Sequence, residues 1–390
     1  MNMRLIVITH PPSFASASMP RFAKMIMDGM VERGHIVESW TSLRGIERLP
    51  VRSAKLRKWL RYLDQFLIYP GQLRKQVLQQ PADTLFVVTD QALGMWVPHL
   101  ANRPHVIHCH DFLALKSALG EFPENPTSWT GRQYQRLIKK GFSRGEAFIS
   151  VSRKTRQDLH RFLPGVPKIS EVVHNGLNYA FRPMELAERA RLLQQIKSGI
   201  PECGFILHIS GNQWYKNPRG VLEIYRAYAI SRSDPLALWM VGAPPDDQLL
   251  NLASSIPSPG KVHFLSGLNN EQVNAAYSHA QVLLFPSLEE GFGWPVVEAM
   301  ASRCPVITTN LAPMTEIAGE TARFIPRMPE SGRQREVWAN SAAAVMDDII
   351  CLNGVHRVKL LQDGRSNADR FDPQLALAAY ERIYAQAIKG

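Results

Sequence analysis

Residues 286–317 read PSLEEGFGWPVVEAMASRCPVITTNLAPMTEI. They begin at the end of residues 282–286, an apolar run that predicts a buried strand. A loop with two glutamates and two glycines follows, and Trp294 and Pro295 open a helix, since proline is favoured in a first helical turn. Glycine lets the backbone approach a ligand closely, and the free N–H groups of a helix start suit a phosphate or a hydroxyl. The stretch therefore predicts a ligand-binding strand–loop–helix unit, although a plain turn with solvated glutamates has the same local pattern.

The rest of the chain alternates short apolar strands with helices in two successive halves. At 390 residues the chain is too long for one hydrophobic core, so we expect two domains. The expected strands are residues 4–9, 84–89, 105–108 and 147–151 in the first half and residues 205–210, 236–241, 262–265, 282–286, 305–308 and 322–325 in the second. Strands separated by helices indicate βαβ units, so the predicted fold is α/β, with two doubly wound parallel sheets that face a cleft. Ligands of such sheets bind beyond the carboxyl ends of the strands.

The pattern from residue 290 onward resembles the E-x7-E region of retaining glycosyltransferases of family 4, which have the GT-B fold of two Rossmann-like domains. The matching residues are Glu290, Gly291, Phe292, Gly293 and Glu298. The resemblance implies that Glu290 bonds the hydroxyls of a donor sugar, helped by backbone N–H groups of residues 291–293, and that Glu298 holds the ribose of a nucleotide. Family members often have glycine where this chain has Arg303, at a helix end, and we expect only a structural consequence there.

The same resemblance implies the domain boundaries. Residues 1–180 are expected to form a Rossmann-like acceptor-binding domain, residues 181–202 a connection, and residues 203–372 the domain that binds the nucleotide-sugar donor. A final helix, about residues 373–389, is expected to pack back onto the first domain.

A loop that reads GNQWYKNPRG, residues 211–220, follows the first expected strand of the second half. The resemblance implies a basic pair here that neutralises the diphosphate leaving group, and Gly211 and Lys216 match its pattern. Asn212 stands where an arginine is usual, and Arg219 is the candidate substitute. A fixed cation is useful because breaking a sugar–phosphate bond places negative charge on a phosphate oxygen. Without this context, a single lysine would more often be a solvated surface residue.

The segment HVIHCHD, residues 105–111, ends an expected strand of the first half. His108 and His110 share a face, because side chains alternate along a strand. These histidines and Asp111 could bind a metal, or His108 could be a buried core residue, but no second histidine pair has ligand spacing and we expect no metal site. His110 resembles the active-site histidine of the family, which contacts the donor sugar. Asp111 is expected to orient His110 or to cap the following helix.

Two further loops follow expected strands. Leu268, beside Gly267, is a candidate for contact with the nucleobase, and the alternative is a plain turn. Residues 9–19 stand where family members contact the diphosphate or the acceptor, but they lack the usual double glycine and predict only a weak contribution.

The net charge of +11 is concentrated in the first half of the chain. Residues 1–180 contain 25 Lys and Arg against 13 Asp and Glu, whereas residues 181–390 contain 20 against 21. This asymmetry predicts an anionic partner for the first half. Residues 52–69 surround an apolar stripe with cations, which is typical of a helix that lies on anionic lipid or packs its stripe on the sheet. No aromatic platform or groove-binding motif indicates nucleic acid, which is not expected as a partner.

The four cysteines form no CxxC pair, which argues against a zinc site or a disulfide framework and favours a reducing compartment. No stretch approaches the ~20 apolar residues of a membrane-spanning helix. We therefore expect a cytoplasmic protein, and peripheral contact with the inner face of the plasma membrane is a further hypothesis.

The predicted function is transfer of a hexose from a nucleotide diphosphate sugar to a glycan or lipid-linked acceptor in polysaccharide or glycoconjugate biosynthesis. On family frequency, a UDP-sugar is the first candidate donor and GDP-mannose the second. The resemblance implies retention of the anomeric configuration, by a same-face displacement that needs no metal or other cofactor. A nucleotide-sugar epimerase of GT-B fold and a non-enzymatic anion-binding adaptor are the alternatives.

Overall fold

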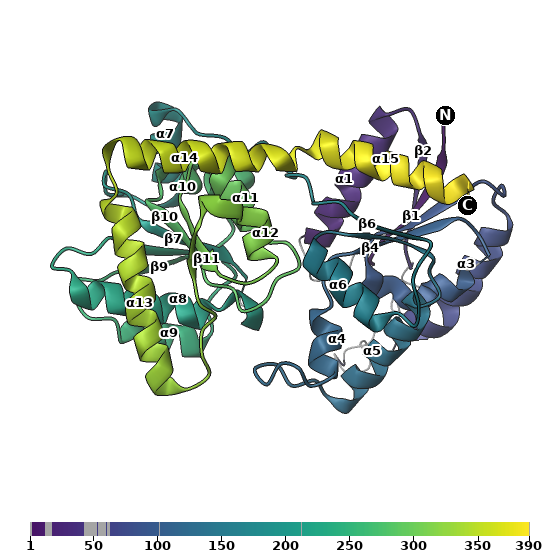
Figure 1. The fold of residues 1–390 in the computed structure, drawn as a ribbon, viewed down its shortest axis with the longest axis horizontal. Coiled ribbons are helices and arrows are strands. Elements are labelled where there is room, and N and C mark those ends of the chain that lie inside the picture. Colours follow the sequence, from purple (N-terminus) through teal and green to yellow (C-terminus); the bar gives the residue numbers. More distant parts are fainter. Residues whose placement is uncertain are drawn as a thin grey trace. The chain divides into compact units, whose positions relative to one another are not determined.

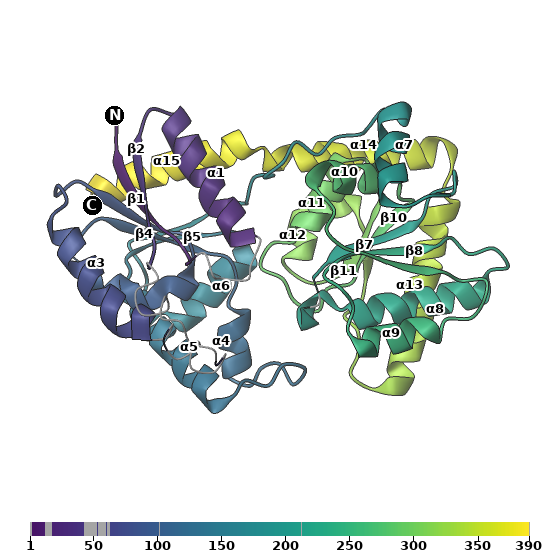
Figure 2. The same cartoon turned by 180° about the vertical axis from the view of Figure 1, so that it is seen from behind.

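The computed structural model describes residues 2–11, 18–42, 53, 60, 63–100, 102–211 and 213–389, without the side chain of Leu67. The chain forms two compact units (Figure 1; Figure 2). The first contains Met1–Asn178 and Pro373–Gly390, and the second contains Tyr179–Asp372. Residues 181–202, which we expected to connect the two domains, are therefore part of the second unit.

The first unit is built on a six-stranded sheet. Its strands are β1 (Arg4–Ile8), β2 (Ile36–Trp40), β3 (Leu85–Val88), β4 (His105–Cys109), β5 (Ala147–Ser150) and β6 (Ile169–Val172). They lie in the order β2-β1-β3-β4-β5-β6, and all neighbouring strands are parallel. The sequence did not predict β2 and β6, because these two edge strands include polar, partly exposed positions that interrupt an apolar run.

Helices cover both faces of the first sheet (Figure 1). They are α1 (Ser18–Glu32), η2 (Asp64–Ile68), α3 (Tyr69–Leu78), η3 (Gln91–His99), α4 (Leu113–Ala118), α5 (Trp129–Phe142), α6 (Arg153–Phe162) and α15 (Pro373–Lys389). On one face, Ile6 and Phe86 of the strands pack with Trp96 of η3 and Phe142 of α5 in one buried cluster. Coverage on both faces is what continuous apolar strands in a parallel sheet require.

The C-terminal helix α15 packs on the opposite face of the first sheet. There, the imidazole Nε2 of His108 lies 2.7 Å from the hydroxyl of Tyr384. Helix α1 approaches α15 at Gly29, where an added Cβ would lie 2.4 Å from a methyl carbon of Leu377. Residues 373–389 therefore belong to the first unit although they follow the whole second unit in the chain.

The second unit contains another six-stranded parallel sheet, in the order β12-β11-β10-β7-β8-β9. Its strands are β7 (Ile206–Ser210), β8 (Leu238–Gly242), β9 (Val262–Leu265), β10 (Val282–Phe285), β11 (Val306–Thr309) and β12 (Arg323–Ile325). Its helices are α7 (Leu186–Ile196), η4 (Trp214–Lys216), α8 (Pro218–Ser231), α9 (Asp247–Ser254), α10 (Asn270–His279), α11 (Trp294–Ala301), α12 (Met314–Ala318), η5 (Gly319–Thr321), α13 (Gly332–Cys351), α14 (Gly354–Ala368) and η6 (Asp369–Phe371). Strand residues pack with Tyr225 of α8 and with Trp338 and Met346 of α13 in one buried cluster.

Each sheet has a switch point, at which successive chain connections leave in opposite directions. It lies between β1 and β3 in the first sheet and between β7 and β10 in the second. Ligands of doubly wound sheets bind beyond the carboxyl ends of the strands at such a point. The loops that follow these four strands are therefore where a functional site is expected.

The four cysteines are free, Cys109 and Cys304 being buried and Cys203 and Cys351 exposed. Within the described ranges of the chain, no helix has both the length and the apolar character that crossing a bilayer requires.

Candidate functional site

An ion pair joins the two loops at the switch point of the second sheet. Lys216, which follows β7, donates to Oε1 of Glu290, which follows β10, over 2.7 Å. The hydroxyl of Ser287 donates to the same oxygen over 2.9 Å. Only 15% of the Lys216 side chain and 7% of the Glu290 side chain are exposed. Because both side chains are largely buried, water screens their charges only weakly. The two opposite charges therefore interact strongly at this edge of the sheet.

Asn217 fixes the loop that carries Lys216. Its backbone is left-handed, with φ of 56°, and its side-chain oxygen caps the N-terminus of α8. The amide of the same side chain donates to the carbonyl of Pro286 over 3.0 Å and so reaches the end of β10. The Leu288 N–H donates to the Tyr215 carbonyl over 2.8 Å. The two loops are therefore fastened together on either side of the ion pair.

His208 of β7 is a buried neighbour of Lys216. Its Nδ1 lies 2.9 Å from the carbonyl of Leu284, and because a carbonyl only accepts, Nδ1 carries the proton. Nε2 then accepts from the hydroxyl of Ser210 over 2.6 Å. Burial lowers the pKa of His208 to about 4, and the charge of Lys216 also lowers it. His208 is therefore neutral near pH 7, and Lys216 supplies the positive charge at this edge.

The loop after β10 turns into α11 at Gly293. The backbone of Gly293 is left-handed, with φ of 95°, and an added Cβ would lie 2.4 Å from the methyl carbon of Met314. Glycine is therefore required by both the backbone conformation and the space. Arg303, shortly after α11, has φ of 57°, a backbone conformation that glycine adopts more readily than arginine does.

Glu298 lies on α11, and Tyr277 of α10 holds its carboxylate. The tyrosine hydroxyl donates to Oε2 of Glu298 over 2.9 Å. Tyr277 is fully buried, and its pKa is raised well above the ordinary value by burial and then by the charge of Glu298. The hydroxyl therefore stays protonated and acts as the donor. This support for Glu298 was not predicted from the sequence.

Arg219, another donor-side candidate, does not join the ion pair. Arg219, at the start of α8, donates to Glu223 over 2.8 Å and lines an open pocket with residues of α9 and α13. Its guanidinium is thus bonded to Glu223 rather than to Glu290. Asn212 lies outside the described residues, directly after Gly211. Leu268 is half-buried in the loop between β9 and α10.

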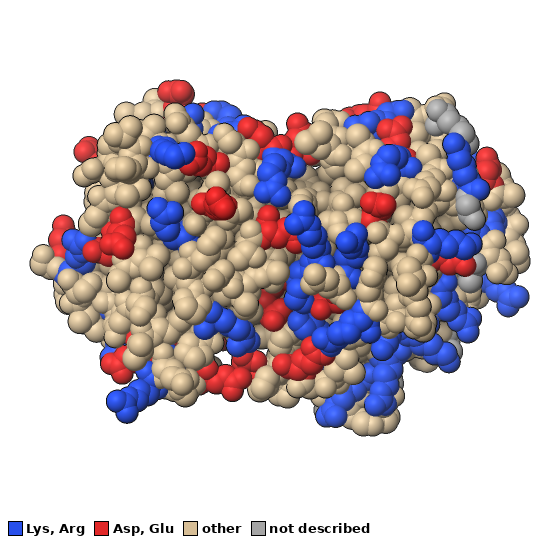
Figure 3. Space-filling view, viewed as in Figure 1, with Lys and Arg blue, Asp and Glu red and all other residues tan. Residues whose placement is uncertain are grey.

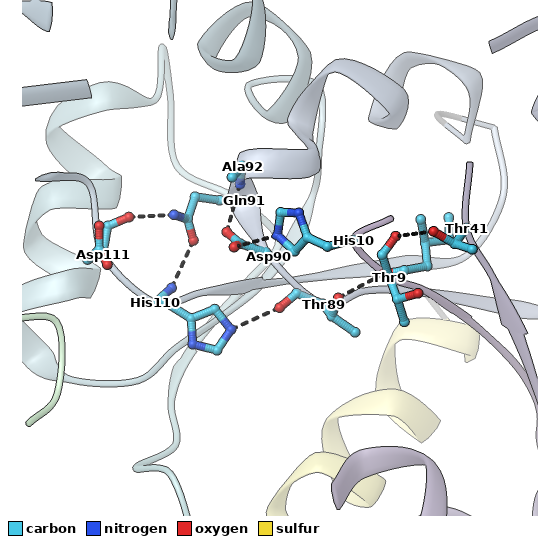
Figure 4. Close-up of polar contacts among 10 residues, drawn as sticks. Thr9, His10, Thr41, Thr89, Asp90, Gln91, Ala92, His110 and Asp111 are labelled. Carbon is cyan, nitrogen blue, oxygen red and sulfur yellow. Dashed lines mark hydrogen bonds and ion pairs between the residues drawn. The ribbon is translucent and has the colours of Figure 1, made fainter. Parts of the chain in front are cut away.

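The switch point of the first sheet holds a buried, hydrogen-bonded pair of an imidazole and a carboxylate (Figure 4). His10, which follows β1, donates through Nε2 to Oδ2 of Asp90, which follows β3, over 2.8 Å. The exposed fractions of the two side chains are 7% and 9%. Burial raises the pKa of Asp90, but the hydrogen bond and charge of His10, the charge of His110 and the Ala92 N–H together lower it below its ordinary value. Asp90 is therefore ionised near neutral pH.

His110 follows β4 and faces the same edge (Figure 4). Its Nε2 lies 2.8 Å from the carbonyl of Thr89 and therefore carries the proton. Its backbone N–H donates to the side chain of Gln91 over 2.8 Å, and the Gln91 amide in turn donates to the Asp111 carbonyl. Burial lowers the pKa of His110, although the charge of Asp90 opposes this. In the neutral imidazole Nδ1 is an acceptor, which suits a ligand hydroxyl.

His108 and His110 lie on one face of β4, as predicted, because both rings contact Phe22 with centroid distances of 5.2 and 4.4 Å. His108 is fully buried and bonded to Tyr384, so it is the core histidine. Asp111 accepts from the first backbone N–H of α4 over 3.0 Å. Across the parts of the chain that the structure describes, no group of three or more His, Cys, Asp or Glu side chains could hold a metal ion.

His10, Asp90 and Gln91 were not predicted as site residues from the sequence. Asp90 is 80 positions from His10, and no local motif links the two. The available signal was topological, because His10 and Asp90 each directly follow an expected strand and the carboxyl ends of parallel strands meet at one sheet edge.

Comparison with solved structures identifies the class of fold. A glycosyltransferase from Rickettsia africae aligns over 100% of both chains, with a TM-score of 0.69 and 15% identity. This low identity shows the fold alone. The two doubly wound units are the GT-B fold.

Family models identify the family. The model described as "Glycosyltransferase Family 4" matches residues 19–181, and the model described as "Glycosyl transferases group 1" matches residues 194–327. Together they span parts of both units, and the chain belongs to glycosyltransferase family 4.

Two curated relatives are similar over part of the chain. The O-antigen chain mannosyltransferase B of Escherichia coli is 30% identical over 229 residues, which are 58% of this chain and 58% of the relative. The MMP alpha-(1->4)-mannosyltransferase of Mycolicibacterium hassiacum is 42% identical over 181 residues, 45% of this chain and 41% of the relative. The chain thus spans about half the length of these relatives.

Proposed function

We propose that the protein transfers a hexose from a nucleotide diphosphate sugar to a hydroxyl group of a glycan or lipid-linked acceptor. The observation that carries the proposal is the buried Lys216–Glu290 pair at the switch point of the second sheet. This pair puts a cation suited to a leaving diphosphate beside a carboxylate suited to sugar hydroxyls. Membership of a glycosyltransferase family supports the same activity.

On the donor side, Lys216 would stabilise the charge that develops on the diphosphate as the sugar–phosphate bond breaks. Glu290 positions this cation by accepting its hydrogen bond. When a donor binds, each partner can exchange part of their mutual bond for oxygens of the donor. Glu298, supported by Tyr277, would accept hydrogen bonds from the ribose hydroxyls.

On the first unit, we assign His110 to a hydroxyl of the donor sugar and the His10–Asp90 pair to the acceptor. His110 offers Nδ1 as an acceptor, since its Nε2 proton is used by the Thr89 carbonyl. His10 and Asp90 provide a buried, hydrogen-bonded imidazole and carboxylate at a sheet edge. Polar groups of this kind orient hydroxyl-rich substrates by hydrogen bonding.

We propose that the reaction retains the anomeric configuration. In a same-face displacement, the bond from C1 to the diphosphate oxygen breaks, and the acceptor oxygen forms its bond to C1 on the same face. The acceptor proton passes to the leaving phosphate oxygen, so no nucleophile from the protein is needed. Proton NMR of the first product tests this point, because an inverted anomer would contradict it.

UDP and GDP are the two candidate nucleotides of the donor. Family frequency favours a UDP-sugar, whereas the relatives named mannosyltransferases support mannose as the sugar and hence GDP-mannose as the donor. Competing the two donors in one reaction, with product mass as the readout, distinguishes them.

Catalysis is proposed to need no metal, because Lys216 can provide the positive charge that a metal would otherwise bring to the diphosphate. We expect the transfer rate in excess EDTA to stay within about twofold of the untreated rate. The reason is that Lys216 already stabilises the negative charge that develops on the leaving diphosphate. Loss of activity in EDTA, restored by added Mg²⁺ or Mn²⁺, would contradict this.

The proposed function is tested by incubating the protein with UDP- and GDP-sugars and with glycan or polyprenyl-linked acceptors, and by following nucleotide release and product mass. Transfer that depends on both substrates supports the proposal. Turnover of the donor to an epimer without an acceptor would instead support an epimerase. Absence of donor binding with retained binding of anionic surfaces would support an adaptor.

We also propose that the protein works in the cytoplasm and touches the inner face of the plasma membrane, where a lipid-linked acceptor would be presented. The basic excess of residues 1–180 supports this location. Half of residues 52–69, the predicted basic amphipathic helix, lie outside the described residues, among them all of its lysines and arginines.

A further inference from the structure

A pocket lies between three helices of the second unit. Helix α8 packs against α13 and α9 on one face of the second sheet (Figure 1), and side chains of all three line an open pocket of about 400 Å³. Both basic and acidic side chains reach the surface over this part of the second unit (Figure 3). Sites for small molecules measure about 300–1,000 Å³, so the pocket has the size for a compact ligand. Neither Lys216 nor Glu290 is among the described residues that line it, so it is separate from the donor-binding edge of the sheet.

Three arginines line this pocket, and two of them have hydrogen-bond donors to spare. The Arg335 side chain, on α13, is only 20% exposed, yet its Nε has no hydrogen-bond partner among the described residues. Its Nη1 lies 3.9 Å from Oε1 of Glu223, which is too long for a hydrogen bond. Arg226, on α8, is exposed and forms no ion pair with any residue that the structure describes. Because a largely buried cation without hydrogen bonds is costly, the pocket favours an anionic ligand.

Glu223, which also lines the pocket, leaves the donors of these two arginines available. The Nε of the third arginine, Arg219, donates to Oε1 of Glu223 over 2.8 Å, so Glu223 is bonded to Arg219 instead. The start of α13 also lines the pocket at Gly332, where an added Cβ would meet no atom within 4 Å. The free N–H groups and the dipole of a helix start favour an anion. Guanidinium groups beside such a helix start suit the oxygens of a phosphate.

The remaining lining of the pocket suits a sugar. Glu336 and Asn340 of α13 are exposed and, being four residues apart, lie on the same face of the helix. A carboxylate accepts hydrogen bonds, and an amide both donates and accepts them, so this pair can bind hydroxyl groups. Leu252 and Ala339 add apolar surface on which the C–H groups of a sugar ring can pack. None of the described residues that line the pocket is aromatic, so a nucleobase would find no ring on which to stack.

We propose that the pocket between α8, α9 and α13 binds a hexose monophosphate. Its phosphate accepts hydrogen bonds from Arg226 and Arg335, and its hydroxyls bond to Glu336 and Asn340. One compact anionic group joined to a body rich in hydroxyls matches both the chemistry and the size of the pocket. None of these four residues belongs to the donor-binding edge or to the residues assigned to the acceptor. The ligand is therefore neither the donor nor the acceptor of the proposed reaction.

Isothermal titration of the full-length protein at constant ionic strength tests this inference. The probes are the 6-phosphates of glucose, mannose and fructose, glucose 1-phosphate, inorganic phosphate and free glucose. At least one hexose phosphate should bind about tenfold more tightly than inorganic phosphate, because only the sugar adds hydrogen bonds to Glu336 and Asn340. Free glucose should bind at least about tenfold more weakly than that hexose phosphate, because it lacks the charged group that the arginines bind.

Variants separate the two parts of the ligand. Arg335→Met and Arg226→Met should each weaken both the hexose phosphate and inorganic phosphate at least about tenfold, the cost of losing a charged hydrogen bond. Asn340→Ala should weaken the hexose phosphate about fivefold and leave inorganic phosphate unchanged. The matched control is Arg333→Met, the same change at an exposed residue of α13 that does not line the pocket, which should bind both probes as wild type does. Thermal unfolding checks that each variant is folded, and Arg226 and Asn340 are exposed enough to be changed safely.

Three results would overturn the inference: no binding of any hexose phosphate, wild-type binding by both arginine variants of the pocket, or an equal loss in Arg333→Met. Lys216→Ala and Asp90→Asn should bind the hexose phosphate as wild type does, and a loss in either would place the ligand at an edge of a sheet instead of in the pocket. The outcome is distinguishable from that of the proposed function. Failure of every nucleotide to bind would defeat the proposed function and leave the hexose phosphate titration as the test of the pocket.

Discussion

The polar edges of the two sheets are built in different ways. In the second unit, Glu290 and Glu298 come from one continuous stretch, and Lys216 joins them from the neighbouring loop. In the first unit, His10, Asp90 and His110 each come from a different loop. The polar edge of the second sheet contains the ammonium group of Lys216, whereas the polar edge of the first sheet contains the imidazoles of His10 and His110. A short motif can therefore reveal the polar edge of one sheet, whereas the polar edge of the other sheet is recognised only from the folded structure.

The largest expected effect tests the cation of the second edge. Lys216→Ala should reduce kcat by about 100- to 1000-fold, the usual cost of removing a group that stabilises charge developing in the transition state. Steady-state rates of nucleotide release would measure it.

The control for Lys216→Ala is Arg219→Ala. Arg219 is bonded to Glu223, so this change should alter kcat by less than about threefold if Arg219 plays no part in binding the leaving group. Equal losses of kcat in the two variants would mean that Arg219 takes the role of the arginine that family members usually have at the position of Asn212. Arg219 would then belong to the donor-binding edge.

A pH dependence of stability comes from His208 below the second edge. Burial lowers its pKa to about 4, so the folded protein keeps it neutral while the unfolded chain takes up a proton below about pH 6.5. The stability present above pH 6.5 is therefore lost as the pH falls toward 4, by about 3 kcal/mol for this group. Urea unfolding of wild type and His208→Asn across this range measures the difference.

The asparagine in His208→Asn can still donate to the Leu284 carbonyl but cannot take up a proton. Its free energy of unfolding should thus fall less steeply with acid than that of wild type. The exposed residue His160, changed in the same way, serves as the control and should leave the slope unchanged. Identical slopes for wild type and His208→Asn would show that His208 does not titrate as described.

The first edge is tested by Asp90→Asn, which keeps the size of the side chain but removes its charge. The hydrogen bond from His10 would lose its ionic character, which costs about 1.5 kcal/mol, or about tenfold. We expect the KM for the acceptor to rise about tenfold while the Kd for the nucleotide changes by less than about twofold. A weaker nucleotide Kd with an unchanged acceptor KM would reverse the assignment of the two edges.

The smallest effect is expected from Tyr277→Phe. This change removes the hydroxyl that donates to Glu298 and leaves the buried ring in place. Loss of one hydrogen bond behind a ligand-binding carboxylate should weaken nucleotide affinity about fivefold, corresponding to about 1 kcal/mol. Isothermal titration with the preferred nucleotide would measure it, and an unchanged Kd would exclude Tyr277 as a support for Glu298.

Much of the fold could be predicted from sequence because the central strands are short and continuously apolar. The strands that were missed, β2 and β6, lie at the edges, where an exposed residue such as Ile36 or a partly buried one such as Glu171 is tolerated. In the site, glycines and carboxylates at fixed spacing predicted the loop after β10. The bond between Lys216 and Glu290 joins residues 74 positions apart, and the bond between His10 and Asp90 spans 80. Contacts over such separations depend on strand order, which no local pattern specifies.

The central claim is that the edge of the second sheet binds the nucleotide diphosphate of a sugar donor. Thermal unfolding of wild type and Lys216→Ala with UDP, GDP or ADP tests it most directly. At a hundredfold excess over Kd, one of UDP and GDP should stabilise wild type by about 2.7 kcal/mol and raise Tm by several degrees, with a much smaller shift for Lys216→Ala at the same concentration. No shift with any nucleotide, or equal shifts in the two proteins, would contradict the claim.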